Sequence, residues 1–151
     1  PFEALRESNR LWIALCRSNS GLIRCALQLG DELPEFAHLV QSLNRKWHDL
    51  ISLSVVRHYP EGALDPQNAL LAAYMLGAMM DELVRRLIIY PDQDLHKLLR
   101  DLGMDDNGLA DAATVVWARV LYPGLKIEAD LEASAAAFAS WASGPPAMPR
   151  P

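Results

Sequence analysis

One segment near the middle of the chain, residues 69–80, is apolar around its whole circumference. Its sequence, ALLAAYMLGAMM, has no charged residue and no polar face at the helical repeat. A helix of this kind has to be covered on both sides. The segment is too short to cross a membrane, which takes about 20 apolar residues, and Asp81 and Glu82 follow it directly. The sequence therefore predicts a buried helix, with no membrane span and no membrane partner.

Helical spacing of apolar residues recurs along the chain, and the alternation typical of β-strands is nowhere sustained. The predicted fold class is all-α. Ser20 is expected to cap the second helix, and Gly30 is expected to end it. Pro34 and Pro66 suit the first turns of the third and fourth helices, and Gly103 is expected to end the fifth helix. We expect helices over residues 2–17, 20–29, 34–59, 66–90, 92–102, 109–122 and 127–143.

The net charge and the two cysteines limit the classes of function open to the chain. A net charge of -5 opposes direct binding to a phosphate backbone. Cys16 and Cys25 lie in apolar helical surroundings and are expected to be reduced, which favours a cytoplasmic protein. The four histidines show no close pair of the kind that zinc sites use, so neither a metal nor another cofactor is predicted. No acid, base and nucleophile are expected to converge, so no catalytic residue is predicted.

A second segment, residues 109–122, is also apolar nearly all round. Two such helices exceed what one small core covers, so the economical prediction is a homodimer; a buried hairpin in a monomer is the alternative. The small residues Ala69, Ala73 and Gly77 permit close helix approach, whereas Leu71, Met75 and Met79 are expected to face the interior of the same chain. The predicted interface residues are Ala69, Ala73, Gly77, Met80, Leu109, Ala113, Val116, Trp117 and Val120.

Several phrases in one order carry a family resemblance: EALRESNRLW, SNSGLIRCALQLGDELPEF, LNRKWHDLI, ALLAAYMLGAMMDELVRRL and GLADAATVVWARVLYPG. Together they resemble the C-terminal regulatory domain of tetracycline-repressor-like (TetR) bacterial transcription regulators. The resemblance implies an antiparallel helical bundle that encloses a small-molecule pocket and dimerises through its last two long helices, here residues 69–90 and 109–122. It also implies operator DNA binding by an N-terminal helix-turn-helix domain.

The resemblance covers residues 1–124, the expected ligand-binding and dimerisation domain. An extra C-terminal helix is expected in residues 125–143 and a flexible tail in 144–151. The chain departs from the family pattern in lacking the helix-turn-helix segment and in adding the extra helix. A longer parent protein is therefore expected, with DNA as a partner only through the absent domain.

A pocket for a small apolar effector needs inward apolar and aromatic side chains with a few polar groups. The predicted ligand-binding residues are Trp12, Cys16, Leu43, Trp47, Leu71, Tyr74, Met75 and Met79, and Asn9, Asn44, His48 and Glu82 are possible polar anchors. Core packing is the alternative role of each apolar residue. The leading hypothesis is a ligand sensor of a transcription regulator. A ligand-free helical dimerisation or adaptor module and a small α-helical enzyme are the competing hypotheses.

Overall fold

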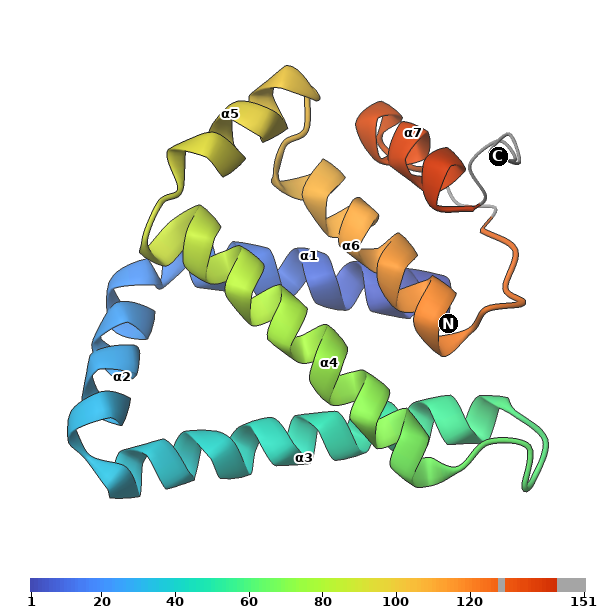
Figure 1. The fold of residues 1–151 in the computed structure, drawn as a ribbon, viewed down its shortest axis with the longest axis horizontal. Helices are drawn as coiled ribbons and strands as arrows, with labels where there is room; N and C mark the ends of the chain where they lie inside the picture. Colours follow the sequence, from blue (N-terminus) through green and yellow to red (C-terminus); the bar gives the residue numbers. More distant parts are fainter. Residues whose placement is uncertain (128–129, 144–151) are drawn as a thin grey trace, which may run out of the picture. The chain divides into compact units, whose positions relative to one another are not determined.

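The structure, a computed structural model, describes residues 1–127 and 130–143 (Figure 1). Within these ranges the chain forms seven α-helices and one π-helical turn, with no β-strand, which confirms the all-α prediction. None of the described helices is both long and apolar enough to span a membrane. The helices divide into two compact units. We call Cys16–Pro91 the continuous unit, and Pro1–Leu15 together with the chain from Asp92 onward the split unit.

Three helices and the π-helical turn build the continuous unit: α2 (Ser20–Glu32), α3 (Pro34–His58), α4 (Pro66–Val84) and η1 (Arg85–Ile89). Helix α2 contacts α3, α3 contacts α4, and η1 returns to α2, so the three helices form a triangle (Figure 1). At the last corner Arg24 donates a 2.7 Å hydrogen bond from Nη2 to the carbonyl of Ile89. This bond satisfies a carbonyl that the end of the helix leaves unpaired.

The ends of α3 and α4 follow the predicted signals. Pro34 and Pro66 occupy first-turn positions, and Asp65 caps α4 by accepting a 2.8 Å bond from the backbone N–H of Gln67. Ser20 does not cap α2: the N-cap is Asn19, without a side-chain hydrogen bond, and Ser20 is the first helical residue. Gly30 does not end α2, which continues to Glu32. The prediction was wrong there because the backbone at Gly30 does not enter the positive-φ region, where glycine terminates helices.

The split unit contains the start of α1 (Phe2–Ser18), α5 (Gln93–Asp101), α6 (Asp106–Leu121) and α7 (Ala133–Ala142). After α5, Gly103 adopts a φ of 63°, as expected for the glycine that ends this helix, and Asp105 caps α6 by accepting a hydrogen bond from the N–H of Gly108. Helix α7 packs on α6. One cluster of the core of the split unit consists of Phe2, Val115 and Ala118, with Leu125, Ile127, Leu131, Phe138, Ala139 and Ala142 packed against it.

Helix α7 is shorter than the predicted helix over residues 127–143, because residues 125–127 and 130–132 are not helical. The predicted tail, residues 144–151, lies outside the described residues. Helix α7 belongs to the same unit as α6, so the predicted boundary at residue 124 does not coincide with a boundary between the units.

Candidate functional site

Helix α4 faces the opposite way from the prediction. Its small residues Ala69 and Ala73 are buried, the latter completely, whereas Leu71 is 60% and Met75 67% exposed. The expectation that Leu71 and Met75 point into the interior of the chain is therefore wrong. The physical reason is the close approach of α3 and α4, which suits small side chains at their contact. Helical periodicity identifies the residues that share a face but not which face turns inward.

The contact between α3 and α4 centres on His48. Its ring packs on that of Tyr74 with the centroids 4.2 Å apart and lies over Gly77. His48 is buried, and its Nδ1 has no hydrogen-bond partner in the described part of the chain. Burial lowers the pKa of His48 below its ordinary value, against the opposing effect of the Asp81 charge. The ring is therefore held neutral, as part of the packing between the two helices.

The eight predicted ligand-binding residues differ widely in burial. Cys16 is fully buried, and this burial, assisted by the Asp81 charge, raises the pKa of its thiol to about 11. The other seven are at least partly accessible: Met79 is half-buried, Trp12 and Tyr74 are partly exposed, and Leu43, Trp47, Leu71 and Met75 are largely exposed. Their proposed role in binding an effector stays a prediction.

One side of α3 carries an exposed apolar stripe. Its members follow one another at alternating intervals of four and three residues, the spacing that keeps side chains on one helical face. All are exposed except the first, which is half-buried: Phe36, Val40, Leu43, Trp47 and Leu50. We call this set the α3 stripe. It includes two of the predicted ligand-binding residues.

The predicted dimer residues are mostly buried within one chain. Ala69, Ala73 and Met80 on α4 are buried and Gly77 is half-buried. On α6 the buried ones are Leu109, Ala113 and Trp117, whereas Val116 is half-buried and Val120 is 50% exposed. Side chains already covered in a single chain offer no surface to a second copy. The dimer, and the part of these residues in its interface, stay predictions, although most of the side chains are already covered within one chain.

The four possible polar anchors differ in their surroundings. Asn9 is buried and donates a 2.9 Å hydrogen bond to Thr114, and His48 is buried as described above. Glu82 binds Arg85 and Arg86, whose hydrogen bonds lower its pKa to about 2. Asn44 is exposed. None of these four side chains needs an effector to explain its position.

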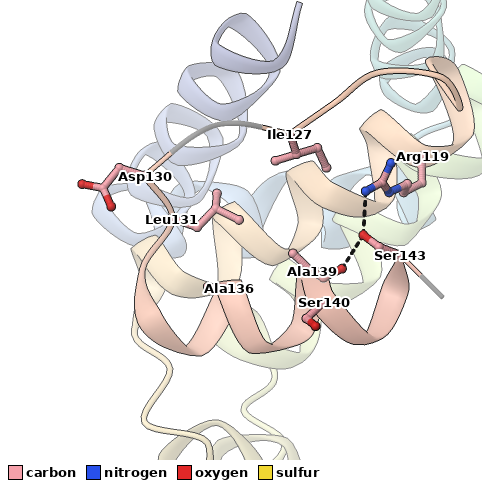
Figure 2. Close-up of a pocket in the computed structure, with 8 residues that line it drawn as sticks. All are labelled: Arg119, Ile127, Asp130, Leu131, Ala136, Ala139, Ser140 and Ser143. Atoms are coloured by element: carbon pink, nitrogen blue, oxygen red, sulfur yellow. Dashed lines mark hydrogen bonds between the residues drawn. The ribbon is translucent and has the colours of Figure 1, made fainter. Parts of the chain in front are cut away.

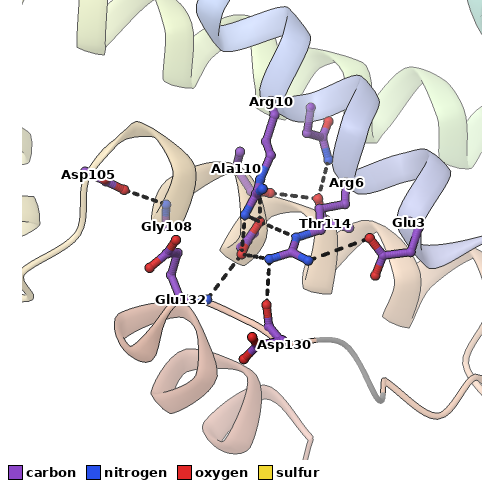
Figure 3. A network of polar contacts seen from close by, with 11 residues as sticks. Glu3, Arg6, Arg10, Asp105, Gly108, Ala110, Thr114, Asp130 and Glu132 are labelled. Atoms are coloured by element: carbon purple, nitrogen blue, oxygen red, sulfur yellow. Dashed lines mark hydrogen bonds and ion pairs between the residues drawn. The ribbon is translucent and has the colours of Figure 1, made fainter.

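A buried ionic network lies in the split unit and was not predicted (Figure 3). Asp111 is 0% exposed and receives two hydrogen bonds from each of Arg6 and Arg10, at 2.8 and 3.0 Å. The backbone N–H of Glu132 donates a further bond at 3.3 Å, and Arg6 also reaches the carbonyl of Asp130 at 2.7 Å. The network thus ties α1 and the segment before α7 to α6.

Burial alone would raise the pKa of Asp111. The hydrogen bonds from Arg6 and Glu132, with the charges of both arginines, outweigh burial and hold the pKa below its usual range. The carboxylate is therefore ionised in the folded protein. One acidic residue inside the apolar run GLADAATVVWARVL, with arginines four apart on another helix, is a signal from which this pairing could have been found.

An open groove of about 390 Å³ lies along α7 in the split unit (Figure 2). Its walls combine apolar side chains with one arginine, one aspartate and two hydroxyl groups. The residues lining it are Arg119, Ile127, Asp130, Leu131, Ala136, Ala139, Ser140 and Ser143. None of them belongs to the predicted ligand-binding set. All of its lining residues except Arg119, which lies on α6, come from the segment after residue 124.

Among the described residues, no group of three or more histidine, cysteine or acidic side chains is arranged to hold a metal ion. Comparison with known proteins adds no assignment: the chain matches no protein-family model, no curated protein and no solved structure.

Proposed function

We propose that this chain is the effector-sensing and dimerisation domain of a TetR-like transcription regulator. In this proposal, a bound small molecule controls operator binding by a helix-turn-helix domain outside these 151 residues. The order of the helical phrases supports the proposal, together with the all-α fold. The effector acts by binding one of two dimer arrangements more tightly than the other, which shifts their populations.

The observation that carries the proposal is the exposed apolar surface of α4. Leu71 and Met75 lie four residues apart on one face, with Ala78 exposed one turn further along. Contiguous apolar side chains at the surface of a protein mark interaction sites, since leaving them in water costs free energy. In the revised proposal this exposed face, and not the buried Ala69–Ala73–Gly77 stripe, meets a second copy.

The sensing half of the proposal rests on different residues. Leu43 and Trp47 project from α3 without cover, and an apolar effector would remove their surface from water. A tryptophan in this position would report such binding through its fluorescence. The expected effector is a small apolar molecule, consistent with the absence of a charged residue among the eight predicted contacts.

The dimer is tested by native mass spectrometry and sedimentation on the wild type and on Leu71→Glu with Met75→Glu. A dimeric wild type and a folded, monomeric double variant are the expected results. Gln67→Glu, an exposed position on the same helix, adds a negative charge as the matched control and keeps the dimer. A monomeric wild type, or a double variant that remains dimeric, contradicts the assigned face.

A ligand-free dimerisation or adaptor module is the second candidate. It is favoured by the surface position of Leu71 and Met75, which fits protein contact at least as well as an enclosed pocket. A thermal-shift screen against apolar compounds, read together with Trp47 fluorescence in wild type and Trp47→Phe, separates the two candidates. Stabilisation that depends on Trp47 supports the sensor, whereas a dimer that no compound stabilises supports the adaptor.

A further inference from the structure

Within residues 1–127 and 130–143, Arg119 in the groove along α7 is a cation with only neutral partners. Its Nη2 donates a 2.6 Å hydrogen bond to Ser143 Oγ, and its Nη1 donates a 3.3 Å bond to the carbonyl of Leu125. Its Nε is buried and has no hydrogen-bond partner among the described residues. Arg6 and Arg10, by contrast, both form ion pairs with Asp111. A guanidinium that has lost part of its water, and that no carboxylate of the described chain neutralises, is suited to bind a carboxylate ligand.

The remaining groove surface defines the rest of the ligand. Asp130 lies at the opposite end from Arg119 (Figure 2), and the structure shows no ion pair between the two side chains. Ile127, Leu131 and Ala139 supply apolar contact between these ends. The volume of about 390 Å³ falls within the range of small-molecule sites.

We propose that this groove binds a small amphipathic carboxylate. Arg119 holds the carboxylate and is itself positioned by Ser143, whose Oγ accepts its hydrogen bond and donates to the carbonyl of Ala139. The hydrocarbon part lies on Ile127, Leu131 and Ala139. The site lies wholly in the split unit and uses none of the eight residues predicted to bind an apolar effector. This proposal therefore does not depend on the proposed regulator function.

The test is a titration of the whole chain with sodium octanoate, followed by two-dimensional amide NMR. Octanol and octylammonium serve as neutral and cationic probes of the same chain length. Octanoate is expected to shift the signals of α6 and α7 and to bind about tenfold or more tightly than octanol, since a charge-assisted hydrogen bond is worth that factor. Octylammonium is expected not to compete with octanoate.

Three variants locate the site. Arg119→Gln is expected to weaken octanoate binding about tenfold or more, and Ala139→Leu to weaken it by filling the groove. Arg100→Gln removes an exposed positive charge on α5, outside the groove, and is expected to leave the affinity unchanged. If Arg119→Gln fails to fold, as judged by circular dichroism, the octanoate affinities of Ala139→Leu and of the charge-retaining Arg119→Lys are compared with that of the wild type instead.

The proposal is overturned if octanoate does not bind up to its solubility limit or if octanol binds equally well. It is also overturned if the folded Arg119→Gln and Ala139→Leu variants keep wild-type affinity, because octanoate would then bind elsewhere. A loss of affinity in Arg100→Gln equal to that in Arg119→Gln would show a general charge effect, and would likewise overturn it.

Discussion

His48 Nε2 occupies the place beside Gly77 in which a side chain would begin. A Cβ built at position 77 would lie 2.4 Å from this nitrogen, closer than real Cβ contacts allow. The imidazole itself is held against the Tyr74 ring, so it has little freedom to withdraw. The absence of a side chain at position 77 therefore fixes how closely α3 and α4 approach.

Replacing Gly77 by alanine is expected to destabilise the protein by about 1–3 kcal/mol, although alanine is the better helix former, because the added methyl overpacks the contact. Urea unfolding followed by circular dichroism measures the change. In a His48→Ala background the same substitution is expected to cost much less, since its steric partner is gone. Equal costs in the two backgrounds would contradict the contact.

Gly30→Ala is the matched control. Gly30 lies within α2, and a Cβ there meets nothing within 4 Å. The substitution is expected to stabilise the protein by up to about 1 kcal/mol, through helix propensity alone. A destabilised Gly30→Ala protein would show that glycine at this position has a role not visible in the helix.

As the pH is lowered from 6.5 to the depressed native pKa of His48, the free energy of unfolding of the protein is expected to decrease. The pKa of this residue is depressed in the folded state by burial, so within that window the unfolded chain binds the extra proton and the native state does not. The charges that face it are Asp81, which favours protonation most, Asp49 and Arg45. Its contribution to the slope is at most about 1.4 kcal/mol per pH unit.

Urea unfolding at a series of pH values between about 5 and 8 checks this expectation. His48→Phe is expected to flatten the dependence, and His38→Gln, at an exposed position of the same helix, is expected to keep it. A wild-type slope that survives in His48→Phe would assign the effect to another group.

Asp111→Asn is expected to destabilise the split unit by about 3–5 kcal/mol, because it leaves two arginines partly desolvated without a counter-charge. Asp101→Asn removes an exposed carboxylate that binds Lys97 at 2.7 Å, and is expected to cost less than about 1 kcal/mol. Chemical denaturation of both variants provides the comparison. Similar losses of stability in the two variants would mean that the buried Asp111 network stabilises the protein no more than an exposed ion pair does.

The two cysteines are expected to react at very different rates. Cys25 is exposed, whereas Cys16 is buried and its pKa is raised to about 11, so little thiolate forms at pH 8. Iodoacetamide treatment of the native protein, followed by peptide mass spectrometry, is expected to modify Cys25 first. In urea both cysteines are expected to react. Prompt alkylation of Cys16 in the native state would contradict its burial.

Local signals allowed most helix boundaries to be predicted from sequence. Pro34, Pro66 and Gly103 act through the backbone of their own turns, and each is found where the sequence places it. Gly30 misled the prediction because glycine permits a helix to end but does not force it to. The π-helical turn at Arg85–Ile89 was not predicted, since it interrupts a continuous apolar pattern.

Local sequence signals could not predict which face of α4 is buried. Ala73 and Met75 are both apolar, and only the shape of the neighbouring helix decides which of them is buried. Arg119 raises a similar problem, because the sequence contains nothing that tells a cation with neutral partners from one paired with an acid. Such positions depend on contacts between segments that lie far apart in the chain.

The pairing of Arg6 with Asp111 joins residues 105 positions apart, with the whole continuous unit encoded between them. During synthesis, α1 therefore leaves the ribosome long before the carboxylate that pairs with Arg6 and Arg10 exists. The continuous unit has no such delay, because all its helices are made in succession. Vectorial synthesis should thus let the continuous unit fold first, and the split unit fold only when α6 has emerged.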